Sequence, residues 1–411
     1  MLLIPTYIGI GFLGLPYMVK LLGLWVGSSG LLIYGLLNEL GALVLTDCTS
    51  RLTERTGERY SDIGTVAEMS MKLGPPCLQH YAGKFRFSVN CTIFISYGLF
   101  LPDLIATMNL FAKDILRQYV DINDKLLIVA ISVLLLPVYL TRRMKLMSYL
   151  ATAGNIILFV IIIISFQHIC RDLPDTSSRS SYTFIDFLTI TSFTNDVMFS
   201  YDGIAMVLPI RNRMKSMKNF DGWNGILGLA LVFVISFHVG CGFYGYLKFG
   251  ELTQVTYILN LTENDWISKS LKILSFLTSY LTIGLSVFVV AEIIWTYLKE
   301  KFTNAIVQNY GEFICRGILL IFSCAFTILI PEFQLLISLT GCFGANYATL
   351  VVPFVIKMLM LYNDEGSLLP VDKLKRKLTL FCCLVILLVG IYSVVAGTCA
   401  AVYMAVWHIV L

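Results

Sequence analysis

Charged residues are scarce in this chain of 411 residues, where Asp, Glu, Lys and Arg together make up 14%. Soluble domains carry about 25% charged residues and a smaller hydrophobic share than the 57% found here. Histidine occurs four times, and the net charge of +4 is too small to predict nucleic acid as a partner. With a mean hydropathy of +0.79, this composition excludes an ordinary soluble enzyme, a disordered chain and a collagen-like fibre. It predicts a protein embedded in a lipid bilayer.

The motifs of enzymes and metalloproteins are also missing. The 11 cysteines form no C-x-x-C pair, and most lie inside apolar runs, where a thiol packs as a small hydrophobic group. The sequence contains no recognisable nucleophile–base pair, phosphate loop or metal-ligand cluster. We therefore expect a protein that is not an enzyme and that uses no cofactor and no metal.

Long apolar runs are plentiful, and a helix needs roughly 20 such residues to cross a bilayer. Eleven runs between charged breaks predict an all-α polytopic protein with about eleven transmembrane helices in one domain over residues 1–407. The runs are 2–23, 26–48, 87–112, 126–141, 146–166, 184–210, 224–247, 269–298, 312–331, 334–358 and 378–407.

The placement of Lys and Arg predicts the orientation. If the N-terminus is cytoplasmic, the cytoplasmic segments hold 21 of the 30 Lys and Arg residues, which is the positive-inside pattern. The loop over 248–268 is then outside, so Asn260 is the expected N-glycosylation site, whereas Asn90 begins a span on the cytoplasmic side. We expect the protein to reside in the plasma membrane or in an endosomal or lysosomal membrane. The segment Asp364–Leu369 resembles an acidic dileucine signal, which sorts proteins to endosomes and lysosomes.

An internal repeat is visible in two segments. Gly9-Ile-Gly-Phe-Leu-Gly-Leu-Pro16 and Asp202-Gly-Ile-Ala-Met-Val-Leu-Pro209 each lie in the first span of a five-span half. The halves cover about 2–166 and 184–358, and the last span, 378–407, lies outside the repeat. An odd number of spans separates the two copies, so the second is inverted in the membrane, as in many transporters.

Glycines followed by a proline predict that helices 1 and 6 are broken at these segments. The freed N–H groups suit a carboxylate, and the freed carbonyl groups suit an ammonium group or a cation. We expect Gly9, Gly11 and Gly203 to resist bulky replacement, because the backbone must approach the ligand closely. The alternative is that these glycines only allow neighbouring helices to pack closely.

The same residues resemble the amino acid/auxin permease family, and specifically its proton-coupled amino-acid transporter branch. Tyr7-Ile-Gly-Ile-Gly-Phe-Leu-Gly-Leu-Pro16 matches the N-I-G-T-G-x-L-G-L-P motif of span 1. The segment from Phe199 to Met214 is similar to F-x-F-E-G-I-G-x-V-L-P-L-E-N-x-M of span 6, with Asp202 and Arg211 in place of the two Glu residues.

The resemblance implies a five-plus-five inverted-repeat fold that carries small neutral amino acids together with protons. It assigns substrate binding to the backbone and side chains around the two breaks. The candidate substrate-binding residues are Gly9, Ile10, Gly11, Gly14, Tyr201, Asp202 and Gly203.

Acidic residues inside apolar runs are costly and are candidates for carrying the proton. They are Asp103, Asp196, Asp202 and Glu292, with Glu39 as a weaker fifth. A permanent ion pair or a hydrogen-bonded structural carboxyl is the alternative for each of them. His238 is expected to be a neutral hydrogen-bonding residue, and Asn155 is expected to join helices by hydrogen bonds.

Three hypotheses follow from these patterns. The first is a proton-coupled symporter of small neutral amino acids that works by alternating access. The second is an amino-acid sensor of the same fold with little or no transport. The third is a channel or chemoreceptor, which the pair of broken helices disfavours because a pore needs no inverted repeat.

Overall fold

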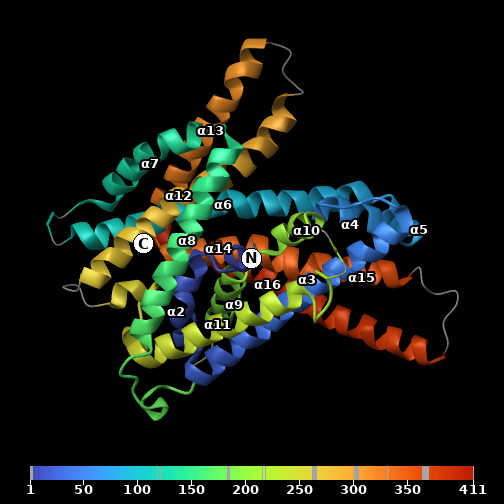
Figure 1. Cartoon of the computed structure of the whole chain (residues 1–411), viewed down its shortest axis with the longest axis horizontal. Coiled ribbons are helices and arrows are strands. Elements are labelled where there is room, and N and C mark those ends of the chain that lie inside the picture. Colours follow the sequence, from blue (N-terminus) through green and yellow to red (C-terminus); the bar gives the residue numbers. More distant parts are fainter. Residues whose placement is uncertain are drawn as a thin grey trace.

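The computed structural model describes the chain apart from residues 1–2, 118, 121, 183–185, 215, 218, 262–265, 300–304, 331, 363–369 and 411. Every regular element in these described residues is a helix, as Figure 1 shows. The first half contains α1 (Leu3–Tyr7), η1 (Ile10–Gly14), α2 (Leu15–Leu22), α3 (Leu24–Thr56), α4 (Ile63–Lys72), α5 (Pro76–Gln79), α6 (Ala82–Leu116), α7 (Asp124–Leu140), α8 (Met144–Ile169) and η2 (Thr176–Ser178).

The second half begins at the sixth predicted span. It contains α9 (Phe187–Ser200), α10 (Ile204–Asn212), α11 (Ile226–Phe249), η3 (Gly250–Leu252), η4 (Tyr257–Asn260), α12 (Trp266–Lys299), α13 (Ala305–Leu329), α14 (Phe333–Thr340), η5 (Gly341–Val351), α15 (Val352–Tyr362) and α16 (Pro370–Val410). The element η5 is a π-helix that joins α14 to α15 without interruption.

Eight stretches of the described chain are helices long and apolar enough to cross a membrane. They correspond to the predicted spans 2, 3, 5, 7, 8, 9, 10 and 11. The other three predicted spans are shorter helices: α7 has 17 residues, and spans 1 and 6 are each divided into pieces. The predicted class, an all-helical membrane protein, is confirmed.

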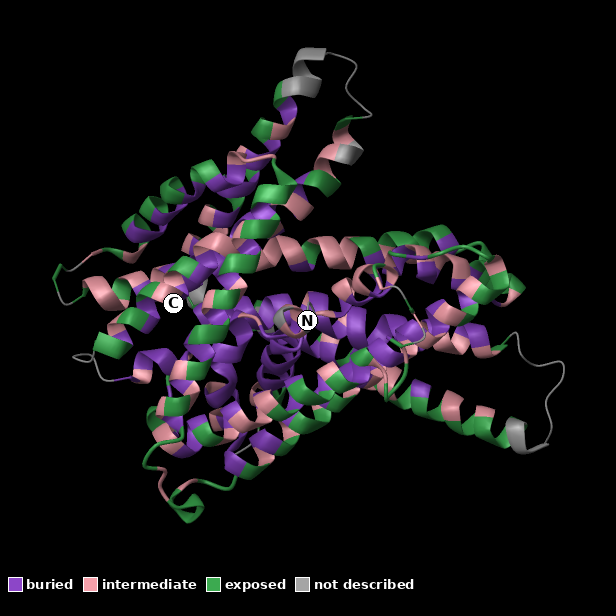
Figure 2. Ribbon diagram, viewed as in Figure 1, coloured by how far each residue is buried: buried purple, intermediate pink, exposed green. Residues whose placement is uncertain are grey.

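The outer surfaces of the long helices are apolar. Figure 2 shows exposed residues along one side of many helices, including α7, α11 and α16. Large hydrophobic side chains account for much of this exposure, among them Val133, Leu229, Ile321 and Leu388. Such a surface is stable against lipid and unstable in water.

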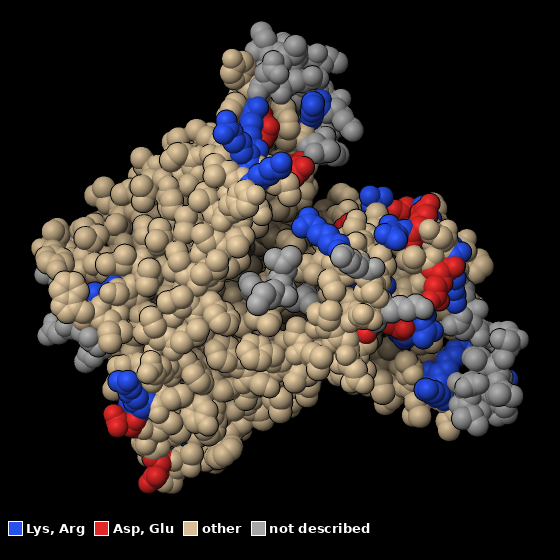
Figure 3. All heavy atoms as spheres, viewed as in Figure 1, with Lys and Arg blue, Asp and Glu red and all other residues tan. Residues whose placement is uncertain are grey.

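Charged side chains gather at the ends of the helices. In Figure 3 most of them lie in two groups, one at the end of α12 and α13 and one over the ends of α3, α4 and α6, with a few more at the left and lower left of the view and a broad uncharged region between them. The surface is hollowed between the two groups. Several helices extend beyond their predicted spans, because polar residues continue the helix outside the apolar run. For example, α3 continues to Thr56 and ends at Gly57, which has the left-handed φ of 74° that favours glycine.

Both predicted helix breaks are present. In the first, α1 ends at Tyr7, η1 begins at Ile10, and Pro16 occupies the first turn of α2, where its missing N–H costs nothing. In the second, α9 ends at Ser200 and α10 begins at Ile204. The structure thus places two interruptions of regular helix where the glycine-rich segments lie.

Candidate functional site

The two helix breaks meet at a cavity. A Cβ atom added to Gly11 would lie 2.8 Å from the Cα atom of Ser200, so the two breaks are in direct contact. Beside this contact is a cavity of about 220 Å³. It is smaller than the roughly 300–1,000 Å³ of typical ligand pockets, and this size suits a small molecule.

The residues that line the cavity come from six regions of the fold. The broken helix 1 supplies Thr6, Tyr7, Gly9, Ile10 and Gly11, and the broken helix 6 supplies Phe199, Ser200, Asp202, Gly203, Ala205 and Met206. The remaining lining residues are Ser96, Tyr97, Phe100 and Leu104 of α6, Ala151, Asn155 and Leu158 of α8, Thr278, Thr282, Leu285 and Ser286 of α12, and Thr340 of α14.

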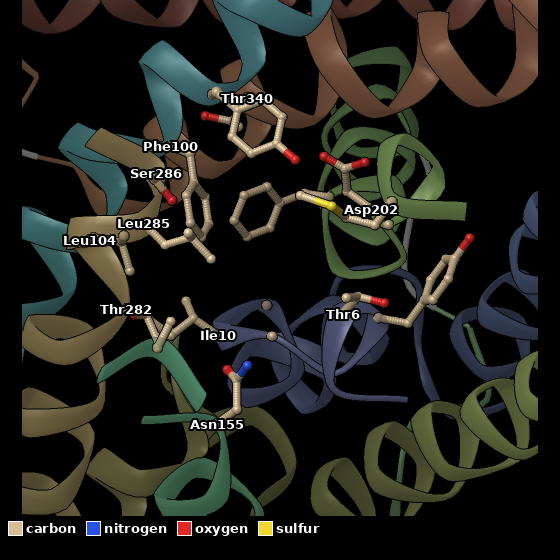
Figure 4. A pocket seen from close by; sticks show the side chains of 18 of the residues that line it. Thr6, Ile10, Phe100, Leu104, Asn155, Asp202, Thr282, Leu285, Ser286 and Thr340 are labelled. Carbon is tan, nitrogen blue, oxygen red and sulfur yellow. The ribbon is translucent and has the colours of Figure 1, made fainter. Parts of the chain in front are cut away.

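Among the described residues, one carboxylate and no cationic side chain line this cavity. Figure 4 shows Asp202 and Thr6 on one side and Leu104, Thr282 and Leu285 on the other. No described residue forms a hydrogen bond or ion pair with the Asp202 side chain. The site can therefore attract a group with positive charge, while Leu104, Leu285 and Ile10 offer an apolar wall.

The α2 side of helix 1 is in contact with the segment that follows α11. The carbonyl oxygen of Val255 would lie 3.4 Å from a Cβ at Gly14, and the Lys20 ammonium group donates to the carbonyl oxygen of Thr253 at 3.1 Å. The segment that follows α11 thus covers the α2 half of helix 1. The opposite half of the cavity is formed by α1 and by the first residues of α10.

Comparisons of the sequence with known proteins identify the family of this chain. The family model described as "Transmembrane amino acid transporter protein" matches residues 1–399. The chain belongs to this family. It is 27% identical over 404 residues to the proton-coupled amino acid transporter-like protein pathetic of Drosophila melanogaster, covering 97% of this chain and 83% of that protein. It is also 22% identical over 400 residues to the probable amino acid transporter skat-1 of Caenorhabditis elegans, covering 94% and 85%.

Five of the predicted substrate-binding residues line the cavity of this family member: Gly9, Ile10, Gly11, Asp202 and Gly203. Two others do not. Gly14 lies under Val255, away from the cavity lining. The ring of Tyr201 stacks on His238 with the ring centres 4.7 Å apart, and its hydroxyl group donates to the carbonyl oxygen of Leu31 at 3.3 Å.

The predicted proton carriers lie in three different settings. Asp103 is buried directly behind the cavity, where its carboxylate accepts a hydrogen bond from Thr340 at 2.7 Å. Asp196 is buried between α9 and α14 and accepts a hydrogen bond from Ser338. Glu292 is exposed on α12, within a stretch long and apolar enough to span a membrane, and it does not line the cavity, so its role as a proton carrier remains a prediction.

His238 is buried, and each ring nitrogen lies close to a backbone carbonyl oxygen, to one of which a neutral ring donates. Its Nδ1 atom lies 2.8 Å from the carbonyl oxygen of Val234 and its Nε2 atom 3.3 Å from that of Ser200. Carbonyl oxygens accept from either nitrogen but donate to neither. The ring therefore links α11 to the helix-6 break and leaves no nitrogen for a ligand.

Several lining residues were not predicted, including Tyr97, Thr340 and Thr278. Asn155, for which the sequence predicts a role in helix packing, lines the cavity, and so do Thr282 and Ser286 of α12. Polar residues spaced along α12 were a usable signal for that wall. For α6 and α14 the sequence gives no comparable signal, because the lining residues are isolated among apolar neighbours.

Arg211, which replaces a family Glu, forms a buried ion pair. Its guanidinium group donates to both carboxylate oxygens of Asp221 at 2.7 Å and to the Ser50 hydroxyl group at 2.6 Å. Arg211 is 3% exposed. The positive charge of Arg211 is thus paired. Together with Ser50, the Arg211–Asp221 pair connects α10, the loop after it and α3.

The predicted glycosylation site is part of a folded loop. The Asn260 amide nitrogen donates to the carbonyl oxygen of Leu252 at 2.7 Å, and its amide oxygen accepts from the backbone N–H of Gln254 at 2.9 Å. Thr262, which completes the sequon, and the dileucine segment Asp364–Leu369 lie outside the described residues. Glycosylation of Asn260 remains a prediction.

Proposed function

We propose that this member of the amino acid transporter family carries small neutral amino acids together with protons by alternating access. The observation that supports this most directly is the unpaired Asp202 carboxylate at the point where two helix breaks meet a small cavity. An amino acid presents an ammonium group, a carboxylate and a side chain, and the cavity offers a complement to each.

The ammonium group pairs with Asp202 and with the carbonyl groups freed where α1 and α9 end. The carboxylate accepts hydrogen bonds from the N–H groups at the beginning of α10, whose first turn has no partners within the helix. The side chain of the bound amino acid points toward the apolar wall of Ile10, Leu104 and Leu285. Because no cationic residue lines the cavity, an acidic side chain would find no counter-charge there.

Transport requires the cavity to open on each side in turn. In this conformation the segment after α11 covers Gly14, while residues of α1 and α10 line the cavity. We infer that the N-terminal side is cytoplasmic and that this conformation faces inward. In the outward conformation the segment over Thr253 and Val255 would leave the α2 half of helix 1.

The test uses the purified full chain in liposomes, with radiolabelled glycine, alanine, leucine, glutamate and lysine as probes. Uptake of glycine and alanine should rise when the outer solution is acidified, and uptake of glutamate should stay at background. Asp202→Asn should abolish alanine binding and uptake, because the amide has no charge to pair with the ammonium group. Binding of alanine without uptake would instead favour the sensor, and no binding of any probe would contradict both.

A further inference from the structure

Glu39 is a fully buried acid in the middle of α3. Its side chain is 0% exposed, and neither carboxyl oxygen has a hydrogen-bond partner among the described residues. An ionised carboxylate in such a place has a very high desolvation cost unless a partner compensates it. The uncharged, protonated carboxyl group is the form that fits these surroundings.

The position of Glu39 connects it to the broken helix 6. Its neighbour Asn38 is 1% exposed and donates its side-chain amide to the carbonyl oxygen of Tyr201 at 3.0 Å. One turn before Glu39, a Cβ atom added to Gly35 would lie 3.0 Å from the Tyr201 hydroxyl oxygen. Residues four apart share a helix face, so Glu39 lies on the face that α3 turns toward the break.

The ionisable groups on the elements that pack against α3 have partners elsewhere. Those partners are Thr253 for Lys20 of α2, Ser338 for Asp196 of α9, Asp221 for Arg211 of α10, Asp47 for Lys357 of α15, and Ser88 for Tyr347 of η5. In α4, Glu68 and Lys72 pair with each other. In α11, the partners are Val234 and Ser200 for His238, Glu251 for Tyr246 and Arg171 for Lys248. Tyr201, in the break itself, donates to Leu31. None of these groups compensates a charge on Glu39.

Glu39 differs in this respect from the other buried acids. Asp103 and Asp196 each accept a hydrogen bond from a hydroxyl group, which stabilises an ionised carboxylate. Asp202 lies at the cavity, where a proton would remove the charge that attracts the ammonium group. Simultaneous transport of an amino acid and a proton is therefore served best by a second acid outside the cavity.

We propose that Glu39 is a proton-binding site, protonated in the conformation described here, and that it releases its proton to water when α3 and the helix-6 break move apart. Its part in transport rests on the proposed symport; its protonation does not. Asn38 and Gly35 supply the mechanical link, because both touch Tyr201, which precedes Asp202. Occupation of the cavity and protonation of Glu39 are thereby coupled through the same short stretch of backbone.

The experiment compares wild type with Glu39→Gln and with Glu54→Gln, an identical change at an exposed position of the same helix. Each full chain is purified and reconstituted in liposomes. Infrared spectroscopy detects the carbonyl stretch of a protonated carboxyl group, alanine-dependent proton entry is followed with an internal pH dye, and alanine exchange is measured without a gradient. The infrared band should be lost only in Glu39→Gln.

Alanine-dependent proton entry should fall by about tenfold or more in Glu39→Gln, because an amide has no proton to release, while exchange is retained. Wild-type proton entry in Glu39→Gln, or an unchanged infrared band, would overturn the proposal. So would failure of Glu39→Gln to fold, because Gln reproduces the neutral carboxyl group and would fail only if a charge were needed. If wild type itself moves no protons, the symport is wrong, and the infrared band still decides whether Glu39 is protonated.

Discussion

Replacement of Gly11 by Ala tests whether the two helix breaks are packed as tightly as the structure shows. The added Cβ atom would lie 2.8 Å from the Cα atom of Ser200 and 3.1 Å from the ring of Phe199. Ser200 cannot easily move away, because its hydroxyl group donates to Val197 at 2.7 Å and its carbonyl oxygen contacts His238 at 3.3 Å. Overpacking of this kind costs about 1–3 kcal/mol.

Gly9→Ala is the matched control, two residues earlier in the same break. A Cβ atom at Gly9 would have no atom within 4 Å, and its φ of −102° and ψ of −164° are an extended conformation that Ala adopts freely. The expectation from sequence concerned bulky replacements at Gly9 and Gly11, and the structure adds that a methyl group has space at Gly9 but not at Gly11. Gly9→Ala should have nearly wild-type stability.

The assay is thermal unfolding of the purified full chain in detergent. The readout is the fraction of protein that remains monodisperse after heating. Gly11→Ala should unfold at a clearly lower temperature than wild type, and alanine exchange should fall with it. Equal midpoints for Gly11→Ala and Gly9→Ala would refute the contact between the two breaks.

Two further predictions concern charged pairs outside the cavity. Asp221→Asn should destabilise the fold by about 3–5 kcal/mol, because it leaves the buried Arg211 charge uncompensated. Asp124→Asn, in an exposed pair, should cost less than about 1 kcal/mol. Similar thermal midpoints for the two variants would contradict this expectation. Hydrogen bonding from Lys72 holds the pKa of Glu68 below its ordinary value of 4.5. The stability that this carboxylate contributes is therefore fully present above pH 4.5 and is lost as the pH falls through the lowered pKa. Glu68→Gln should therefore lower the midpoint at pH 7 and leave it unchanged in strong acid, and an equal loss at both pH values would count against the reasoning.

The helix breaks could be predicted from the sequence because their cause is local. Gly9, Gly11, Pro16 and Gly203 weaken the helix in which they lie, whatever surrounds them. The same holds for the long spans, which follow from apolar runs between charges. Gly14 and Tyr201 lie outside the cavity lining for a different reason, since Gly14 faces Val255 and the ring of Tyr201 stacks on His238.

The function of an acid inside an apolar run depends on which way its helix is turned, and this is not a local property. Glu292 and Glu39 look alike in sequence, yet the first is exposed on α12 and the second is fully buried in α3. A hint lay in the glycines around Glu39, because other parts of the chain pack closely against both Gly35 and Gly41; a Cβ at Gly41 would lie 2.5 Å from the carbonyl oxygen of Thr349. An acid between such small residues faces protein, where an unpaired charge is costly, so its proton becomes sensitive to any movement that lets water in.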